Sequence, residues 1–257
     1  MSSAAELQML YRIGNAPILP FPFPHIYVRD VFPADFYAEL VRSLPPREAF
    51  APLSTVRPMS SDAYDKTRSV LILGAESVGK LAEPYRGVWE RMTRMVLGGG
   101  LGNLVFGKFG QFIKPRFQNQ PNVEFFDEAL LVQDSQNYAL GPHTDSPLKV
   151  ISFLFYLPAD ESQSHLGTSI YVPKDRQFTC PGGPHYPFDR FDRMLTMPYV
   201  PNALFAFLKT PNAFHGVEPV NDEGVQRNLL LYDVRIRGQS QAQAKPPAAG
   251  PAAQFKF

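Results

Sequence analysis

Three residues in the second half of the chain have the types and spacing needed to bind a metal ion. His143 and Asp145 lie two residues apart in the segment GPHTDSP. In extended chain, residues i and i+2 project from the same face, so an imidazole and a carboxylate can share one ion. His215 follows the apolar run 204–208 after a turn at Pro211, where a neighbouring strand could supply a third ligand. The pattern therefore predicts a three-ligand metal site.

Two neutral nitrogens and one anionic oxygen on one face of an octahedron leave three positions open, as at the 2-His-1-carboxylate sites of non-haem iron(II) oxygenases. A His-X-Asp triplet alone is a weak signal, because His143 could donate to a turn carbonyl while Asp145 caps a loop. The order of triplet, β-run, single histidine and then Arg227 favours the metal site.

Arg227 stands at the start of the apolar segment RNLLLY. A guanidinium among strand apolar residues costs several kcal/mol unless it meets an anion. One interpretation is a surface ion pair with Asp233 or Glu218. The other is a planar fork that binds one end of a dicarboxylate. The remaining histidines have blander interpretations: His185 as a solvated or turn histidine that could also contact substrate, His165 as solvated, and His25 as structural.

Composition limits the class of protein. The 257 residues are 44% apolar, enough for a substantial core, and the 26 prolines with scattered glycines favour short strands and turns. A net charge of +1 argues against nucleic-acid and anionic-membrane partners. A single cysteine excludes an intramolecular disulfide and fits a reducing cytoplasm. We find no secretory signal and no apolar run near the ~20 residues of a membrane helix. We expect a soluble, cytoplasmic protein.

The first half of the chain is predicted to be mostly helical. Helical spacing is seen in residues 1–13, in a segment from Pro33 to the stop at Pro45, and in 83–96. Prolines make 17–24 extended, leading into a strand. A glycine-rich break at 98–100 precedes a second apolar stretch that we expect Pro115 to end.

The second half is predicted to be antiparallel β structure, in a sandwich or barrel. Short runs of β-branched, aromatic and leucine residues are separated by turns: 129–132, 150–157, 169–172, 204–208 and 228–234. Residues 174–199 show no convincing period and are predicted to form a long loop, either a functional lid or disordered. The segment 238–257 is of low complexity and is expected to be flexible.

From about residue 124 to 236, the chain resembles the 2-oxoglutarate- and iron(II)-dependent oxygenases, in particular their prolyl-hydroxylase-like branch. The segments that carry the resemblance are YALGPHTD, ISFLFYLP, GTSIYVP, NALFAF, HGVEPV and RNLLLYD, in the family's order. The resemblance implies a mainly β fold with N-terminal helices, built on a double-stranded β-helix of the jelly-roll or cupin type. It divides the chain into a supporting region 1–123, a catalytic core 124–237 with lid loop 174–199, and a flexible tail 238–257.

The resemblance also implies roles for single residues. His143, Asp145 and His215 match the metal ligands, and Arg227 matches the residue that binds the distal carboxylate of 2-oxoglutarate. Tyr156 matches a tyrosine whose hydroxyl assists the same carboxylate. Gln133 and Tyr138 are weaker candidates for contacting the co-substrate or substrate, and ordinary packing is an equal alternative for Tyr138. If the Tyr156 side chain faces inward, the side chains of Ser152 and Leu154 face inward too, because alternate residues of a strand share a face. The implied cofactors are iron(II), 2-oxoglutarate as co-substrate and dioxygen, with ascorbate as an optional addition.

The sequence departs from family patterns in three places. Leu229 replaces the serine of the plant-type Arg-X-Ser, the paired glycines before the fifth core strand are reduced to Leu166-Gly167, and the connection 215–227 is slightly long. No ligand is lost. Asp145 is retained, which disfavours a halogenase.

The implied activity is hydroxylation of a small amino-acid-like or natural-product substrate, or of a peptidyl residue. Two alternatives remain open: a cupin-type metal-dependent isomerase or epimerase, which would not need Arg227, and a non-catalytic jelly-roll binding module. The oligomeric state is undetermined from sequence. Because the ligand histidines must be neutral, activity is expected to fall as pH drops through roughly 6–7.

Overall fold

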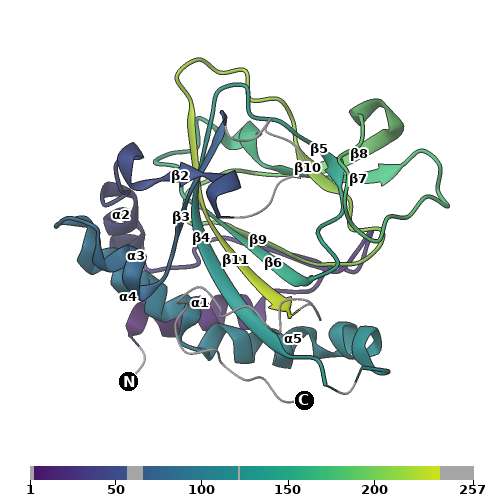
Figure 1. The fold of residues 1–257 in the computed structure, drawn as a ribbon, viewed down its shortest axis with the longest axis horizontal. Helices are drawn as coiled ribbons and strands as arrows, with labels where there is room; N and C mark the ends of the chain where they lie inside the picture. Colours follow the sequence, from purple (N-terminus) through teal and green to yellow (C-terminus); the bar gives the residue numbers. More distant parts are fainter. Residues whose placement is uncertain (1–2, 57–65, 121, 238–257) are drawn as a thin grey trace.

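Two antiparallel sheets form the centre of the molecule in the computed structural model, which describes residues 3–56, 66–120 and 122–237 (Figure 1). The larger sheet has the strand order β1 (His25–Val28), β9 (Leu204–Leu208), β6 (Lys149–Tyr156), β11 (Gln226–Ile236), β4 (Phe125–Ser135), β3 (Arg68–Ile72) and β2 (Ala51–Pro52). The smaller sheet has the order β5 (Leu140–His143), β10 (His215–Val217), β7 (Thr168–Pro173) and β8 (Phe191–Met197). Short 3-10 segments lie at Arg47–Ala49, Leu53–Thr55, Ser164–Leu166 and Phe188–Arg190.

From β4 onward the chain passes back and forth between the two sheets. β4, β6, β9 and β11 belong to the larger sheet, whereas β5, β7, β8 and β10 belong to the smaller one. This is the winding of a double-stranded β-helix, and the two sheets are not closed into a barrel. The mainly β jelly-roll fold predicted from the sequence is therefore confirmed. The strands β1, β2 and β3, from the first part of the chain, extend the larger sheet at its two edges.

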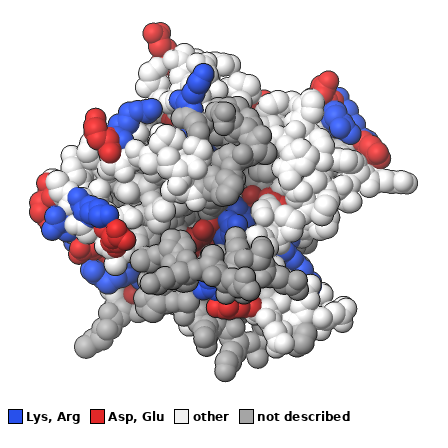
Figure 2. All heavy atoms as spheres, in the orientation of Figure 1, with Lys and Arg blue, Asp and Glu red and all other residues white. Residues whose placement is uncertain are grey.

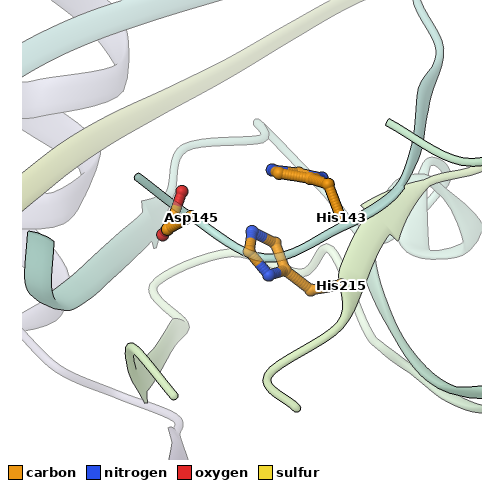
Figure 3. A group of neighbouring side chains, drawn as sticks. All are labelled: His143, Asp145 and His215. Carbon is orange, nitrogen blue, oxygen red and sulfur yellow. The ribbon is translucent and has the colours of Figure 1, made fainter. Parts of the chain in front are cut away.

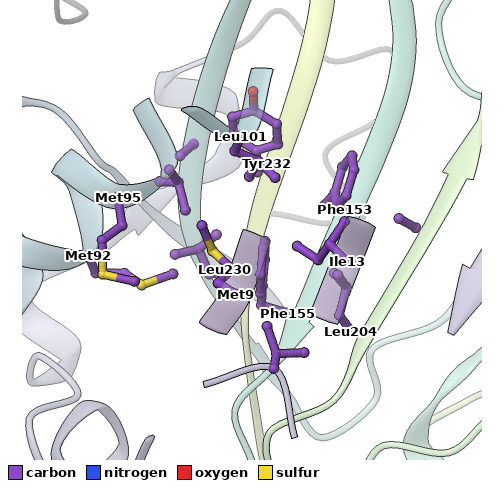
Figure 4. Packing of buried hydrophobic residues seen from close by; sticks show 14 of the residues in the cluster. Met9, Ile13, Met92, Met95, Leu101, Phe153, Phe155, Leu204, Leu230 and Tyr232 are labelled. Carbon is purple, nitrogen blue, oxygen red and sulfur yellow. The ribbon is translucent and has the colours of Figure 1, made fainter. Parts of the chain in front are cut away.

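Helices cover the outer face of the larger sheet. They are α1 (Ala4–Asn15), α2 (Ala34–Arg42), α3 (Ala75–Gly79), α4 (Tyr85–Leu97) and α5 (Gly100–Phe117) (Figure 1). Each long helix buries one apolar stripe, such as Met92 and Met95 on α4, against sheet residues such as Phe153 and Leu230 (Figure 4). Because β6, β9 and β11 are buried on both faces over most of their length, they contain apolar runs without alternation, such as LFAFL in β9 and LLLY in β11.

The two sheets enclose a second apolar cluster, to which Leu130, Val132 and Leu229 contribute from the larger sheet. Their immediate chain neighbours Leu131 and Leu230 belong to the cluster under the helices. Alternate residues of β4 and β11 thus face the two layers in turn, as the pleat requires.

The end of α5 differs from the sequence prediction. The helix continues past Pro115 to Phe117. Pro115 lies in the last turn, where it costs one backbone hydrogen bond, and burial of Ile113 and Phe117 on the same helix favours continuing it. The break before α5 is as predicted, since Gly99 has a φ of 88°, a left-handed conformation that glycine adopts readily.

Residues 174–199 are not a loop throughout. The part from Phe191 to Met197 is strand β8, which pairs with β7 along its length. β8 is an edge strand of the smaller sheet, and its charged residues Asp192 and Arg193 interrupt the kind of apolar run that marked the other strands. The predicted flexible tail 238–257 lies outside the described residues.

No helix among the described residues is both long and apolar enough to cross a bilayer. Lys, Arg, Asp and Glu side chains are interspersed on the face shown in Figure 2, in keeping with the net charge of +1.

One acidic residue lies beneath the helices. Asp127 of β4 is buried, and its carboxylate accepts a hydrogen bond from the Tyr232 hydroxyl at 3.3 Å. Burial raises the pKa of Asp127 to about 6. A raised pKa in the folded state means that ionisation costs stability, and this cost grows as pH rises from the ordinary value of 3.8 to about 6 and is complete above that.

We therefore expect Asp127→Asn to stabilise the protein at pH 7 by about 1–3 kcal/mol. Urea unfolding measures the change. The gain should disappear at pH 3.5, where the aspartate is protonated in both states. An Asp127→Asn protein that is equally stable or less stable at pH 7 would contradict this interpretation.

Candidate functional site

The three residues predicted to bind a metal converge at one end of the space between the sheets (Figure 3). His143 ends β5 and His215 begins β10, and the two residues are direct cross-strand partners. Asp145 follows two residues after His143. The close approach of β10 to β5 depends on Gly216, because a Cβ there would lie 2.4 Å from the carbonyl oxygen of Leu140.

Both histidines are oriented by the backbone. The Nδ1 atoms of His143 and His215 lie 3.0 Å from the carbonyl oxygens of Gly141 and Ala213, respectively. A carbonyl only accepts, so Nδ1 carries the proton and Nε2 keeps its lone pair. Metal-binding histidines are commonly held in this way. One ligand atom from each of His143, Asp145 and His215 lies within 4.8 Å of the others. The donor set fits one divalent ion, and its role as the ligand set stays a prediction.

Asp145 is held by two polar side chains. Ser152 of β6 donates a hydrogen bond to its Oδ2 at 2.9 Å, and the Nζ of Lys149 lies 3.2 Å from its Oδ1. Lys149 also pairs with Asp233 of β11 at 3.0 Å. Burial opposes ionisation of Asp145, but the Lys149 ammonium and the two imidazoles hold its pKa below the ordinary value. The Asp145 carboxylate is therefore anionic throughout the neutral range.

Burial also determines the charge of the histidines. It lowers the pKa of His143 well below the ordinary value and lowers that of His215. A lowered pKa means that protons compete less with a metal for Nε2, so the neutral forms persist to more acidic pH.

We therefore expect metal affinity to fall less steeply as pH drops through roughly 6–7 than it would with unperturbed histidines, and to fall mainly at lower pH. Titration calorimetry with Mn²⁺ across this range measures it. A drop in affinity of tenfold or more between pH 7 and 6 would contradict the pKa directions.

A cavity of about 90 Å³ extends from the triad between the sheets. Arg227 of β11 lines it and is completely buried. Its Nη1 pairs with Asp134 of β4 at 2.7 Å, its Nε donates to the Leu166 carbonyl at 2.7 Å, and its Nη2 lies 3.4 Å from the Thr168 hydroxyl. The surface ion pair with Asp233 or Glu218 considered from the sequence is wrong, because Arg227 faces inward and meets Asp134 instead.

The inward face predicted for β6 is confirmed. Ser152 and Leu154 line the cavity, and Tyr156 is buried next to them in the cluster between the sheets. The Tyr156 hydroxyl accepts a hydrogen bond from the Thr168 backbone N–H at 3.2 Å. Its ring centroid lies 5.8 Å from the guanidinium carbon of Arg227. Tyr156 thus lies beside Arg227, as the resemblance implied.

The two weaker candidates lie further from the cavity. Gln133 pairs in register with Asn228 and donates to its side chain at 3.2 Å, on the strand face opposite to that of Asp134. The structure therefore does not bring Gln133 to the cavity. Tyr138 is buried in the cluster between the sheets, with its ring centroid 4.4 Å from the guanidinium carbon of Arg68.

Among the other histidines, His185 is exposed and lies against the triad, with its ring 4.5 Å from that of His143. His165 pairs with Asp222 at the surface. Sequence reasoning missed Arg68 and Lys149, which both line the cavity. The only available signal was that Lys149 is a charged residue directly before an apolar run.

Comparisons with known proteins rest on structure alone. No protein-family model matches the sequence, and no curated protein matches it. A prolyl hydroxylase from Trichoplax adhaerens, solved with a peptide fragment of the hypoxia inducible factor oxygen degradation domain, has a TM-score of 0.55 at 12% identity; the match covers 94% of this chain and 93% of that one.

Two enzymes of nogalamycin biosynthesis are also similar. The non-haem 2-oxoglutarate-dependent epimerase SnoN has a TM-score of 0.51 at 13% identity, covering 98% of this chain and 92% of that one. The carbocyclase SnoK, of the same cofactor dependence, has a TM-score of 0.51 at 10% identity, covering 100% and 98%. The chain has the fold of the 2-oxoglutarate-dependent oxygenases. At these sequence identities the similarity establishes the fold alone. It confirms the double-stranded β-helix predicted from the sequence.

Proposed function

We propose that the chain is an iron(II)- and 2-oxoglutarate-dependent oxygenase of the prolyl-hydroxylase-like branch, hydroxylating a small molecule or a peptidyl residue. The observation that carries the proposal is the convergence of His143, Asp145 and His215 at one end of a cavity that Arg227 lines. The donor set leaves coordination positions for a co-substrate, and the guanidinium offers a partner for its far carboxylate.

Each residue has a definite task in this proposal. His143 and His215 bind the metal through Nε2, because their Nδ1 protons are engaged by backbone carbonyls. Ser152 and Lys149 fix the Asp145 carboxylate that completes the ligand set. Apolar walls from Leu154, Leu229 and other residues limit access of water.

Bound iron(II) and 2-oxoglutarate supply the oxidation itself, in which dioxygen gives one atom to succinate and one to the substrate C–H bond, with release of carbon dioxide. The similar structures include a peptide-bound hydroxylase and enzymes that act in antibiotic biosynthesis. They support both a peptidyl and a small-molecule substrate for this fold, and both belong to the proposal.

The test measures succinate formation from 2-oxoglutarate by the protein with added iron(II) and ascorbate, under air and under nitrogen. We expect oxygen-dependent succinate formation that EDTA abolishes. His165→Ala is the matched control, because His165 lies on a surface turn, and it should retain full activity. Metal binding without 2-oxoglutarate binding would favour a cupin-type isomerase, and absence of metal binding would favour a binding module.

A further inference from the structure

Two arginines from different parts of the chain lie at the same part of the cavity wall. Arg68 of β3 and Arg227 of β11 both line the cavity. β4 runs between these two strands, and its Asp134 is the direct cross-strand partner of Arg68 on one side and of Arg227 on the other. The three residues form a row across the larger sheet, with the carboxylate in the middle.

Arg227 does not present an unengaged fork to the cavity. Its Nε is taken up by the Leu166 carbonyl and its Nη1 by Asp134, both at 2.7 Å. The contact of Nη2, with the Thr168 hydroxyl, is longer, at 3.4 Å. A carboxylate has about four acceptor positions, and a bidentate partner engages two of them. Nη1 and Nη2 of Arg227 each carry a second N–H that a ligand carboxylate can use, and the acceptor positions that these leave are open to a second cation.

Arg68 is held rigidly beside it. The Nε and Nη2 atoms of Arg68 bind the two oxygens of Asp134 at 2.6 and 2.9 Å, in the bidentate geometry that orients a guanidinium strongly. Its planar group also lies over the Tyr138 ring at 4.4 Å. The Arg68 side chain is 16% exposed and that of Arg227 is 1% exposed, so Arg68 lies on the more open side of Asp134.

We propose that Arg68 is a second binding residue for the distal carboxylate of the co-substrate, sharing this task with Arg227 through Asp134. The inference rests on the proposed function and adds a residue from outside the double-stranded β-helix. Asp134 fixes the separation of the two guanidinium groups, and a ligand carboxylate beside the row meets cations from β3 and β11 together.

The test compares two ligands that differ only at the far end. Calorimetry with Mn²⁺-loaded protein measures the affinity for 2-oxoglutarate and for 2-oxobutanoate, which lacks the distal carboxylate. We expect Arg68→Met to weaken 2-oxoglutarate binding about 10- to 100-fold and to leave 2-oxobutanoate binding within about twofold. Arg68→Lys keeps the charge and should lose less.

Arg235→Met is the matched control, because Arg235 pairs with Glu128 across the same two strands, β11 and β4, and does not line the cavity. It should bind both ligands as the unmodified protein does. Equal affinity of Arg68→Met and the unmodified protein for 2-oxoglutarate would overturn the inference, and so would an equal loss for both ligands, which would indicate a structural role. If the unmodified protein binds metal but no 2-oxoglutarate, the proposed function itself fails.

Discussion

Replacing His143 or His215 with alanine should abolish both metal binding and oxygen-dependent succinate formation. Each imidazole supplies one of only two neutral nitrogens in the ligand set, and its Nδ1 is engaged by the backbone, so no second nitrogen of the same ring can substitute. Titration calorimetry with Mn²⁺ should show no saturable binding at concentrations that saturate the unmodified protein.

Asp145→Ala should have the same effect through a different cause. It removes the anionic ligand and leaves Lys149 beside the two histidines, with Asp233 as its remaining acidic partner. His165→Ala should bind metal normally. Substantial residual turnover in His143→Ala or His215→Ala would contradict the ligand assignment, provided that circular dichroism shows the variants folded.

Replacing Arg227 with methionine should weaken 2-oxoglutarate binding by about 100-fold or more and leave Mn²⁺ affinity nearly unchanged. Arg227 is buried at the cavity wall and touches none of the three predicted ligands, so its loss affects the co-substrate and not the ion. Truncating one partner of a buried charge pair typically costs 2–5 kcal/mol in binding.

The same substitution should also destabilise the fold by about 3–5 kcal/mol, because it removes one partner of a buried ion pair. Urea unfolding measures this cost, and Arg227→Lys serves as a less damaging companion. If metal and 2-oxoglutarate affinities fall in parallel, Arg227 acts through folding and not through the co-substrate. If Arg227→Met binds 2-oxoglutarate with unchanged affinity, Arg227 is not a binding residue for the co-substrate.

The strands of the core could be predicted because a strand that is buried on both faces has an apolar run in its sequence. The run 204–208 is strand β9 with the same bounds, and the run 150–157 is β6 shifted by one residue. Strand β8 was missed because it lies at the edge of the smaller sheet and the charged residues Asp192 and Arg193 interrupt its apolar residues. Pro115 was misjudged because local propensity is weaker than the burial of Phe117 at the end of the helix.

The site was predictable where its residues are close in sequence or carried by a resemblance, as for His143 and Asp145. Partners from distant strands were not. Nothing local indicates that Asp134 lies between Arg68 and Arg227, because that row exists only once β3, β4 and β11 are in register. Lys149 is close to Asp145 in sequence, but its contact was not predicted because it depends on the turn between β5 and β6.

The position of β3 along β4 has a consequence for any shortened form of the protein. A fragment beginning near residue 124 would keep all three predicted metal ligands, but the backbone N–H and C=O groups of β4 that β3 pairs with would face solvent. Unpaired edges of this kind recruit strands from other molecules. Such a fragment would also uncover the apolar face under α4 and α5. We expect it to aggregate, so the smallest autonomous unit includes the helices and β3.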